Sequence, residues 1–244
     1  MSEVEVLYFD DANAVADAAA AGCLLRLAQL LAEKPEVHLM ITGGTVGIAT
    51  LAAMSVNPLR SSVDFRKVHF WWGDERFVAA DSKDRNEVQA REALLSKINI
   101  DESKLHSFPA ADAGLSLEEA LEVFRSEVKK FATPGSELPK FDLVFLGMGP
   151  DGHIASLFPG RELPQPGVQV IAEHDSPKPP PQRLSFTFEA LNSADAVWFT
   201  VASADKAEAV SIAFGESPED LPVGRVHGKL ETVWFLDEAA ASKI

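Results

Sequence analysis

Apolar runs and helical patterns alternate along the whole chain. Short runs rich in Val, Ile, Leu, Phe and Trp predict strands, because apolar runs of roughly four to eight residues are typical of buried strands. The predicted strands cover residues 4–9, 37–41, 68–72, 105–108, 141–146, 168–171, 183–188, 196–201 and 233–236. Apolar residues at helical spacing predict helices over 12–34, 46–55, 86–97, 115–131 and 204–214, with Asp237 placed to cap a last short helix.

This alternation predicts an α/β fold with a mainly parallel sheet. The run 37–41 is nearly all apolar, as expected of a strand in a parallel sheet that helices cover on both faces. The run 183–188 alternates polar and apolar residues, which indicates a half-exposed strand in a small additional β region in the C-terminal half. Because the sequence has no internal repeat and no low-complexity linker, we expect a single domain over residues 1–244.

Composition places the chain among folded globular proteins. Its 244 residues are 46% hydrophobic and 24% charged, which suffices for a full core. The formal charge is −15, from 37 acidic and 22 basic residues, and this argues against general binding to nucleic acid or to an anionic membrane. A site for an anionic ligand must therefore gather the few basic groups locally.

Cysteine content and the N-terminal segment bear on the compartment. Cys23 is the single cysteine, so no internal disulfide can form, and its Ala- and Leu-rich surroundings indicate a buried small side chain. The acidic N-terminal segment lacks the basic region of a signal peptide, and no uncharged apolar run reaches the roughly 18 residues of a membrane span. We expect a cytoplasmic monomer without a membrane partner.

Four predicted strands end in polar turns, and three of these turns contain glycine. Because the carboxyl ends of parallel strands share one edge of the sheet, we expect these turns to face one crevice, where open α/β sheets bind their ligands. The third turn is the densest, with three glycines and a proline in six residues. The turns are 42–45, 73–76, 147–153 and 203–206.

The first turn, Thr42-Gly43-Gly44-Thr45, has the features of an anion site. Gly43 and Gly44 let backbone N–H groups approach a phosphate, the next helix adds partial positive charge at its N-terminus, and the Thr45 hydroxyl is a further donor. The alternative is a tight turn that needs glycine only for its backbone. The motif is neither a Walker loop nor the dinucleotide pattern of three spaced glycines.

Charged residues dominate the second turn, Gly73-Asp74-Glu75-Arg76. After the apolar run 70–72, such a cluster is not expected in the core. The functional interpretation assigns Arg76 to a phosphate or carboxylate, which a guanidinium fits, and assigns Asp74 to the positioning of His153 or of substrate hydroxyls. The alternative is a solvated loop with internal ion pairs.

His153 is the candidate catalytic residue. It ends the segment Asp151-Gly152-His153, where glycines permit close approach of a ligand, and histidine suits proton transfer near neutral pH. The alternative is a hydrogen-bonded structural role. That role is the favoured interpretation for His38 and His69, which lie inside predicted strands.

Two further basic residues are candidates. Arg183 follows the proline-rich segment 177–182, which would hold it in place, although prolines also shape loops without any ligand. Lys206 lies in the first turn of a predicted helix, where a cation is unfavourable against the helix dipole, and this hints at a functional role.

The sequence lacks a cysteine pair, a His-x-x-x-His spacing and a Gly-x-Ser-x-Gly elbow. It therefore favours a reaction without metal, cofactor or covalent nucleophile.

Together these motifs resemble the 6-phosphogluconolactonase family over most of the chain. The resemblance implies a Rossmann-like sheet, shared with glucosamine-6-phosphate deaminases and ribose-5-phosphate isomerases. It also implies hydrolysis of a small sugar-phosphate lactone, 6-phospho-D-glucono-1,5-lactone, to 6-phosphogluconate in the pentose phosphate pathway. Gly47 stands where the family usually has proline, and Arg85 replaces the serine of a Ser-Asn pair. The resemblance rests on residues 72–76, 146–153, 155–160 and 204–206 and on Pro179-Pro180-Pro181 with Arg183.

The resemblance also implies roles for individual residues. His153 would be the general base that activates water, with Asp74 and Arg183 as further catalytic residues. The residues matched to substrate and phosphate binding are Gly43, Gly44, Thr45, Arg76, Asn86 and Lys206.

Two alternatives stay open. A sugar-phosphate isomerase or deaminase would share the fold, but the deaminases typically continue after the histidine into Ala-Phe-Asn-Glu. Here residues 154–158 read Ile-Ala-Ser-Leu-Phe, so the acidic residue used in ring opening is missing. A non-catalytic sugar-phosphate-binding protein could keep the same pocket without activity.

Overall fold

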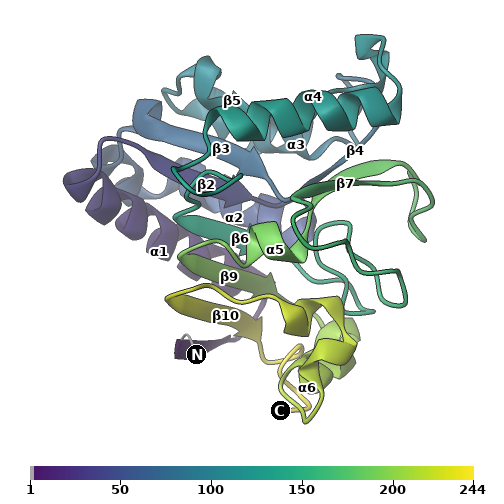
Figure 1. The fold of residues 1–244 in the computed structure, drawn as a ribbon. Coiled ribbons are helices and arrows are strands. Elements are labelled where there is room, and N and C mark those ends of the chain that lie inside the picture. Colours follow the sequence, from purple (N-terminus) through teal and green to yellow (C-terminus); the bar gives the residue numbers. More distant parts are fainter. Residues whose placement is uncertain (1–2) are drawn as a thin grey trace.

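A seven-stranded sheet forms the centre of the computed structural model, which describes residues 3–244 (Figure 1). Its strand order is β1-β10-β9-β6-β2-β3-β5, and every neighbouring pair is parallel. The mainly parallel α/β fold expected from the sequence is confirmed. The strands are β1 (Glu3–Phe9), β2 (Val37–Ile41), β3 (Val68–Trp72), β5 (Leu105–His106), β6 (Leu143–Leu146), β9 (Ala196–Val201) and β10 (Glu231–Asp237).

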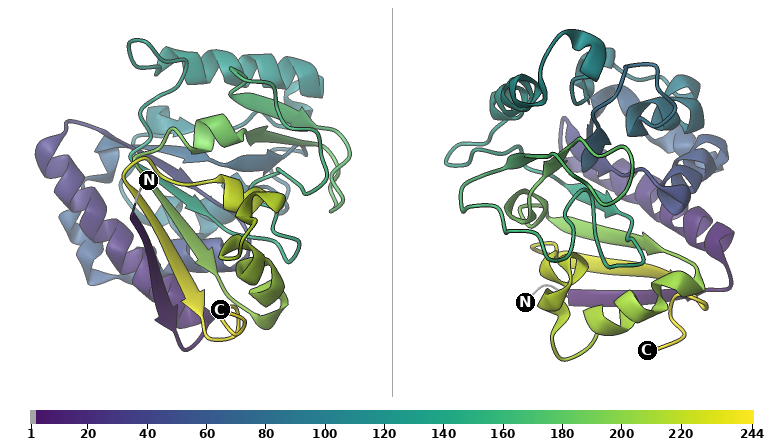
Figure 2. Two further views of the ribbon diagram at one scale, coloured as in Figure 1. Left: turned by 60° about the horizontal axis from the view of Figure 1, so that its bottom comes forward. Right: turned by 90° about the vertical axis from the view of Figure 1, so that its right-hand side faces the viewer.

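Helices cover both faces of this sheet because its strands are apolar on both sides. On one face, the Trp198 ring lies against α1, where a Cβ added to Gly22 would come within 3.3 Å of it. On the other face, Trp71 meets Phe124 of α4 edge to face at 6.4 Å. Figure 2 shows α1 and α4 on different sides of the sheet. The helices are α1 (Ala12–Glu33), α2 (Thr45–Val56), α3 (Asn86–Ala93), α4 (Leu117–Lys130), α5 (Phe188–Leu191) and α6 (Ala207–Ala213).

A small antiparallel sheet forms the additional β region, as expected. Its order is β4 (Asp74–Arg76), β8 (Arg183–Phe186) and β7 (Val170–Glu173). Strand β8, which was expected to be half-exposed, is buried on both faces. The expectation that the charged cluster at 73–76 lies outside the core is wrong, and so is the alternative of a solvated loop: residues 74–76 form a strand, and Asp74 and Glu75 are only 6% and 2% exposed. Partners distant in sequence make this burial possible, because each carboxylate is hydrogen-bonded.

The ends of several elements differ from the sequence prediction. The segment 183–188 divides because Thr187 ends the strand, and its Oγ1 accepts the Ala190 N–H as the N-cap of α5. Other differences include a strand of only 105–106, a helix that ends at 93 in place of 97, a 3-10 turn at 204–206 before α6, and turns in place of a short helix after Asp237.

Helix α1 carries much of the core on its face of the sheet. Val15, Leu24 and Leu27 are fully buried, and Cys23 is buried beside them, as expected. By length and composition alone α1 could cross a membrane, with a mean hydropathy of 1.5 over its most apolar window. This is weak evidence, because the core helix of a soluble protein passes the same test.

The polar turns follow four strands that are neighbours in the sheet, in the order β9-β6-β2-β3. From β2 the chain proceeds outward to β3, whereas from β6 it proceeds in the opposite direction to β9. The strand order therefore reverses between β6 and β2, and such a reversal opens a crevice at the carboxyl ends of the strands. The two turns at the reversal are close, since a Cβ added to Gly147 would lie 4.0 Å from the Gly43 carbonyl oxygen.

Candidate active site

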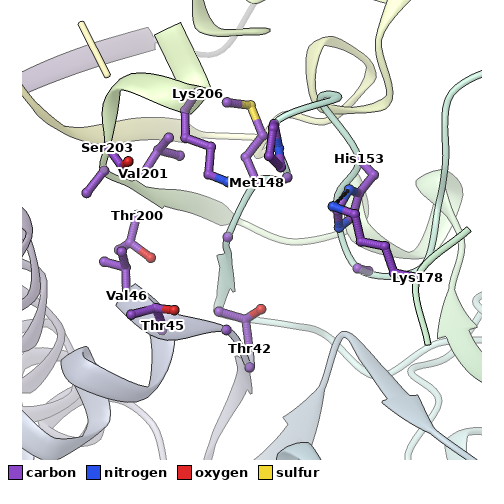
Figure 3. Close-up of a pocket in the computed structure, with 18 of the residues that line it drawn as sticks. Thr42, Thr45, Val46, Met148, His153, Lys178, Thr200, Val201, Ser203 and Lys206 are labelled. Atoms are coloured by element: carbon purple, nitrogen blue, oxygen red, sulfur yellow. Dashed lines mark hydrogen bonds between the residues drawn. The ribbon is translucent and has the colours of Figure 1, made fainter. Parts of the chain in front are cut away.

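A cleft of about 540 Å³ opens at this reversal point. All four polar turns line it, so the crevice expected from the sequence is present. Figure 3 shows Thr45, Thr200 and Lys206 along one side of the cavity and His153 and Lys178 across from them. All nine residues predicted for the site line the cleft: Gly43, Gly44, Thr45, Asp74, Arg76, Asn86, His153, Arg183 and Lys206.

His153 is held by Asp151, two residues earlier in the same turn. Its Nδ1 lies 2.5 Å from Asp151 Oδ1. Because an ionised carboxylate only accepts hydrogen bonds, we assign the proton to Nδ1, and Nε2 keeps its lone pair. The ring rests on Gly149, where an added Cβ would lie 2.0 Å from Nδ1, so only glycine permits this position. The arrangement is that of a general base with a fixed tautomer.

Lys178 adds a positive charge beside this pair. Its Nζ lies 3.3 Å from His153 Nδ1 and 3.7 Å from Asp151 Oδ1. Burial and the Lys178 ammonium lower the pKa of His153 below its ordinary value, against the opposing effect of Asp151. Although burial opposes it, the hydrogen bond from His153 holds the pKa of Asp151 below its ordinary value. His153 is therefore neutral, and able to accept a proton, at neutral pH.

The opposite side of the cleft suits an anion. Helix α2 begins at Thr45 with Gly44 as its N-cap, and no side chain caps its first turn. The N-terminus of a helix carries partial positive charge and free N–H groups, which favour a phosphate or carboxylate. Lys206 adds a full charge on this side, and its Nζ lies 3.0 Å from Asp205 Oδ2.

Asp74 lies in the wall of the cleft. Its Oδ2 accepts a hydrogen bond from Ser156 Oγ at 2.5 Å and lies 3.8 Å from Arg183 Nη1. Of the two roles expected for Asp74, the structure gives the positioning of His153 to Asp151, because Asp74 is engaged by Ser156. Asp74 still lines the cleft, where it can meet substrate hydroxyls.

Arg183 is fixed by the proline-rich segment, as the sequence indicated. Its guanidinium donates to the carbonyl oxygens of Lys178, Pro179 and Pro180 at 3.0 to 3.3 Å. Burial lowers the pKa of Arg183, while Asp74 opposes this shift, and the guanidinium stays protonated at any pH of interest. The guanidinium is thus a preorganised cation in the cleft wall.

Buried Glu75 joins β4 to the N-terminus of α3. Its carboxylate accepts the backbone N–H groups of Arg76, Asn86 and Glu87 at 2.7 to 2.9 Å, and burial raises the pKa of Glu75 to about 7. Two of the residues bound by Glu75 have a buried side-chain atom without a hydrogen-bond partner among residues 3–244. These atoms are Arg76 Nε and Asn86 Oδ1. Asn86 Oδ1 also requires Gly43, since a Cβ there would lie 1.9 Å away.

Asp151 and Lys178 are the site residues that the sequence analysis did not single out. Asp151 belongs to the same quoted motif as His153, but the sequence analysis assigned the positioning of His153 to Asp74, and the hydrogen bond is made by Asp151 instead. Lys178 lies 25 positions from His153 in a proline-rich segment that was read for Arg183 alone. The only signal for it was a lysine enclosed by prolines.

The cleft therefore combines a neutral base, several fixed cations and an uncapped helix N-terminus. Among the described residues, no group of three or more His, Cys, Asp or Glu side chains could hold a metal ion. Such a set of groups can activate water and bind an anionic substrate. The fold and the cleft thus define an α/β protein of the doubly wound type, with a candidate hydrolytic site at the carboxyl edge of its sheet.

Comparison with known proteins identifies the family. The family model described as Glucosamine-6-phosphate isomerases/6-phosphogluconolactonase matches residues 10–234, and the chain belongs to this family. The 6-phosphogluconolactonase of Streptomyces coelicolor is 37% identical, over 96% of this chain and 92% of its own length. That of Mycobacterium tuberculosis is 36% identical, over 100% and 98%. The solved 6-phosphogluconolactonase of Thermotoga maritima has a TM-score of 0.82 and 27% identity, over 96% of this chain and 100% of that one.

Proposed function

We propose that the protein hydrolyses 6-phospho-D-glucono-1,5-lactone to 6-phospho-D-gluconate in the oxidative pentose phosphate pathway. One observation carries the proposal: the Asp151–His153 pair, with Nε2 free, faces the uncapped N-terminus of α2 across a single cleft. Family membership supports it, since near-full-length relatives are 6-phosphogluconolactonases.

The two sides of the cleft set the orientation of the substrate. The 6-phosphate binds at Gly43, Gly44 and Thr45, where helix N–H groups and Lys206 attract a dianion. The lactone carbonyl then lies toward His153. Binding energy from the remote phosphate is used to orient the reacting carbon, which raises the rate beyond what a free lactone would show.

His153 Nε2 removes a proton from water as the oxygen attacks C1 of the lactone. The carbonyl oxygen becomes an oxyanion, which the cations of the cleft stabilise; one such donor contributes about 3 kcal/mol. The intermediate collapses, the bond from C1 to the ring oxygen breaks, and the imidazolium returns its proton to that oxygen. Because a lactone is an activated ester, the reaction requires no covalent nucleophile, metal or cofactor.

The family description also includes isomerases, so the fold alone does not separate the two activities. The segment after His153 favours the lactonase. Residues 154–158 contain no carboxylate for ring opening, and the Ser156 hydroxyl is engaged by Asp74. A non-catalytic sugar-phosphate-binding protein would have no need of a histidine with a fixed tautomer.

We further propose that the chain is one domain over residues 1–244 and acts as a cytoplasmic monomer. The buried, unpaired Cys23 fits a reducing compartment. All nine predicted site residues come from one copy of the chain, so a second copy is not needed to complete the cleft. The net charge of −15 argues against a nucleic-acid partner.

The assay that tests this proposal follows 6-phosphogluconate formation from the lactone, with the spontaneous rate subtracted and a chelator present. Ammonia release from glucosamine 6-phosphate is measured in parallel. We expect lactone hydrolysis that the chelator does not affect, and no ammonia. Ammonia release without lactone hydrolysis would identify the protein as a deaminase. Absence of both activities would favour the alternative of a non-catalytic sugar-phosphate-binding protein.

A further inference from the structure

Thr200 has a buried hydroxyl without a hydrogen-bond partner in the described part of the chain. The residue is only 2% exposed, and its Oγ1 has no hydrogen-bond partner within residues 3–244. A threonine hydroxyl can donate one hydrogen bond and accept others, and leaving it unpaired in the interior destabilises the fold. Valine has nearly the same shape and would avoid this cost, so the hydroxyl needs an explanation.

The position of Thr200 supplies one. Thr200 is the penultimate residue of β9 and lies two positions after Trp198, so strand alternation directs it to the face that α1 and α2 cover. It lines the cleft, and Figure 3 shows it beside Thr45 and Val46 at the start of α2. The unpaired hydroxyl therefore stands at the uncapped helix N-terminus.

Two other cleft residues share this property. Arg76 Nε and Asn86 Oδ1 are also buried, unpartnered within the described chain, and part of the cleft lining. Both were expected from the sequence to meet the substrate. Of the seven residues in the described chain that have such an atom, these three line the cleft, where a ligand can provide the missing partner.

We propose that Thr200 is a further substrate-binding residue, whose Oγ1–H donates to a phosphate oxygen seated at the N-terminus of α2. A dianionic phosphate only accepts hydrogen bonds, so it pairs with helix N–H groups, with the Lys206 ammonium and with a hydroxyl donor in the same way. The inference rests on the proposed function insofar as the ligand is a phosphate ester. It adds a residue that no motif marks.

The hypothesis predicts effects of opposite sign in the free and the bound protein. Thr200→Val removes an unpaired hydroxyl, so the melting temperature of the ligand-free protein stays the same or rises. The same change removes a donor to a charged ligand, so the Kd for inorganic phosphate and for 6-phosphogluconate rises about tenfold or more. Thr200→Ser keeps the hydroxyl and is expected to keep most of the affinity.

Thr187→Val is the matched control. Thr187 is equally buried, but its Oγ1 donates to the Val168 carbonyl at 2.8 Å, and it does not line the cleft. We expect Thr187→Val to lower the melting temperature and to leave both Kd values unchanged. The pair of variants thus separates a binding hydroxyl from a structural one.

The experiment is calorimetric titration with phosphate and with 6-phosphogluconate, together with thermal melting of the free proteins. A Kd in Thr200→Val within twofold of wild type overturns the inference, as does a melting temperature that falls as in Thr187→Val. Wild-type lactone hydrolysis is measured separately. If hydrolysis is absent while phosphate binding depends on Thr200, the proposed function fails and this inference stands.

Discussion

His153, Asp151 and Lys178 act as one unit at the scale of single residues. Asp151 fixes the tautomer and raises the pKa of His153, whereas burial and Lys178 lower it. The balance keeps the imidazole neutral, which a general base requires. The acid limb of the pH profile of kcat/KM, where His153 becomes protonated, is therefore expected below the ordinary histidine value of about 6.5.

Replacement of Lys178 tests this balance. Lys178→Met removes the positive charge 3.3 Å from Nδ1, so the pKa of His153 rises and the acid limb moves to higher pH, by about 0.5 to 1 unit. The measurement is kcat/KM for the lactone from pH 5 to 8. Lys129→Met, an exposed lysine on α4, is the control and should leave the limb in place. Equal profiles for wild type and Lys178→Met would remove Lys178 from this role.

Ser203 occupies a backbone conformation that favours glycine. Its φ is 93°, and the conformation is held by two hydrogen bonds from its N–H to the Asp237 carboxylate, at 3.0 and 2.9 Å. We expect Ser203→Gly to stabilise the fold by about 1 kcal/mol, since relief of strain exceeds the entropic cost of glycine.

Urea unfolding measures this effect. Ser126→Gly, an exposed substitution inside α4, is the control and should lose about 0.5 kcal/mol. The two serine-to-glycine changes thus have opposite signs if Ser203 is strained. A loss of stability in both variants would show that Ser203 carries no strain.

At the scale of elements, the short strand β4 and helix α3 form one unit through Glu75. The carboxylate caps the N-terminus of α3 and also holds the backbone of Arg76, so two elements that line the cleft share one buried anchor. Glu75 is therefore expected to act on binding only through the placement of Arg76 and Asn86.

The raised pKa of Glu75 makes a contribution to stability that depends on pH. Because the folded value, about 7, exceeds the ordinary 4.5, the folded state binds the proton more tightly than the unfolded state. The contribution is fully present below pH 4.5 and is lost as pH rises to 7, and a shift of this size corresponds to about 3 kcal/mol.

Glu75→Gln removes this titration. The free energy of unfolding of the variant, relative to wild type, is expected to rise between pH 4.5 and 7, and urea unfolding at several pH values measures it. Glu119→Gln, which alters an exposed carboxylate in the capping box of α4, is the control for a surface group. A constant difference between Glu75→Gln and wild type across this range would contradict the assigned shift.

How much could be predicted from the sequence also differs between elements. The convergence of the turns after β9, β6, β2 and β3 followed from parallel pairing, because the carboxyl ends of such strands share one edge. The burial of Asp74 and Glu75 could not be foreseen, since it depends on partners as distant as Asn86, 11 positions from Glu75, and Ser156, 82 positions from Asp74. In the sequence, Thr200 looked like any strand residue; it is distinguished by a buried hydroxyl that has no hydrogen-bond partner among residues 3–244.

At the scale of the whole molecule, the carboxyl ends of the sheet's strands carry the candidate site, whereas their amino ends carry a structural core. The cleft gathers cations at the carboxyl ends of the strands, within a chain of net charge −15. Toward the amino ends, His38 and His69 stack at 4.3 Å, and His69 stacks on His106 at 5.2 Å. Burial lowers the pKa of His38 to about 3 and that of His106 to about 4, so these histidines are neutral core residues.

This separation predicts independent effects on stability and activity. His106→Ala removes a ring that stacks on Trp71 at 3.8 Å and hydrogen-bonds His69 and Glu127, each at 2.9 Å. We expect a loss of about 2–4 kcal/mol in stability, with kcat and KM within twofold of wild type at a temperature where the variant is folded. His174→Ala, at an exposed histidine, should change neither. A large fall in kcat for folded His106→Ala would mean that the two ends are coupled.

The central claim is that His153 is the general base of a phosphorylated-lactone hydrolase. It is tested most directly by lactone hydrolysis in wild type and in His153→Ala, with the Kd for 6-phosphogluconate measured in both. The account predicts that kcat falls at least about a hundredfold while the Kd changes little, because the phosphate binds on the opposite side of the cleft. A kcat in His153→Ala close to that of wild type would contradict it.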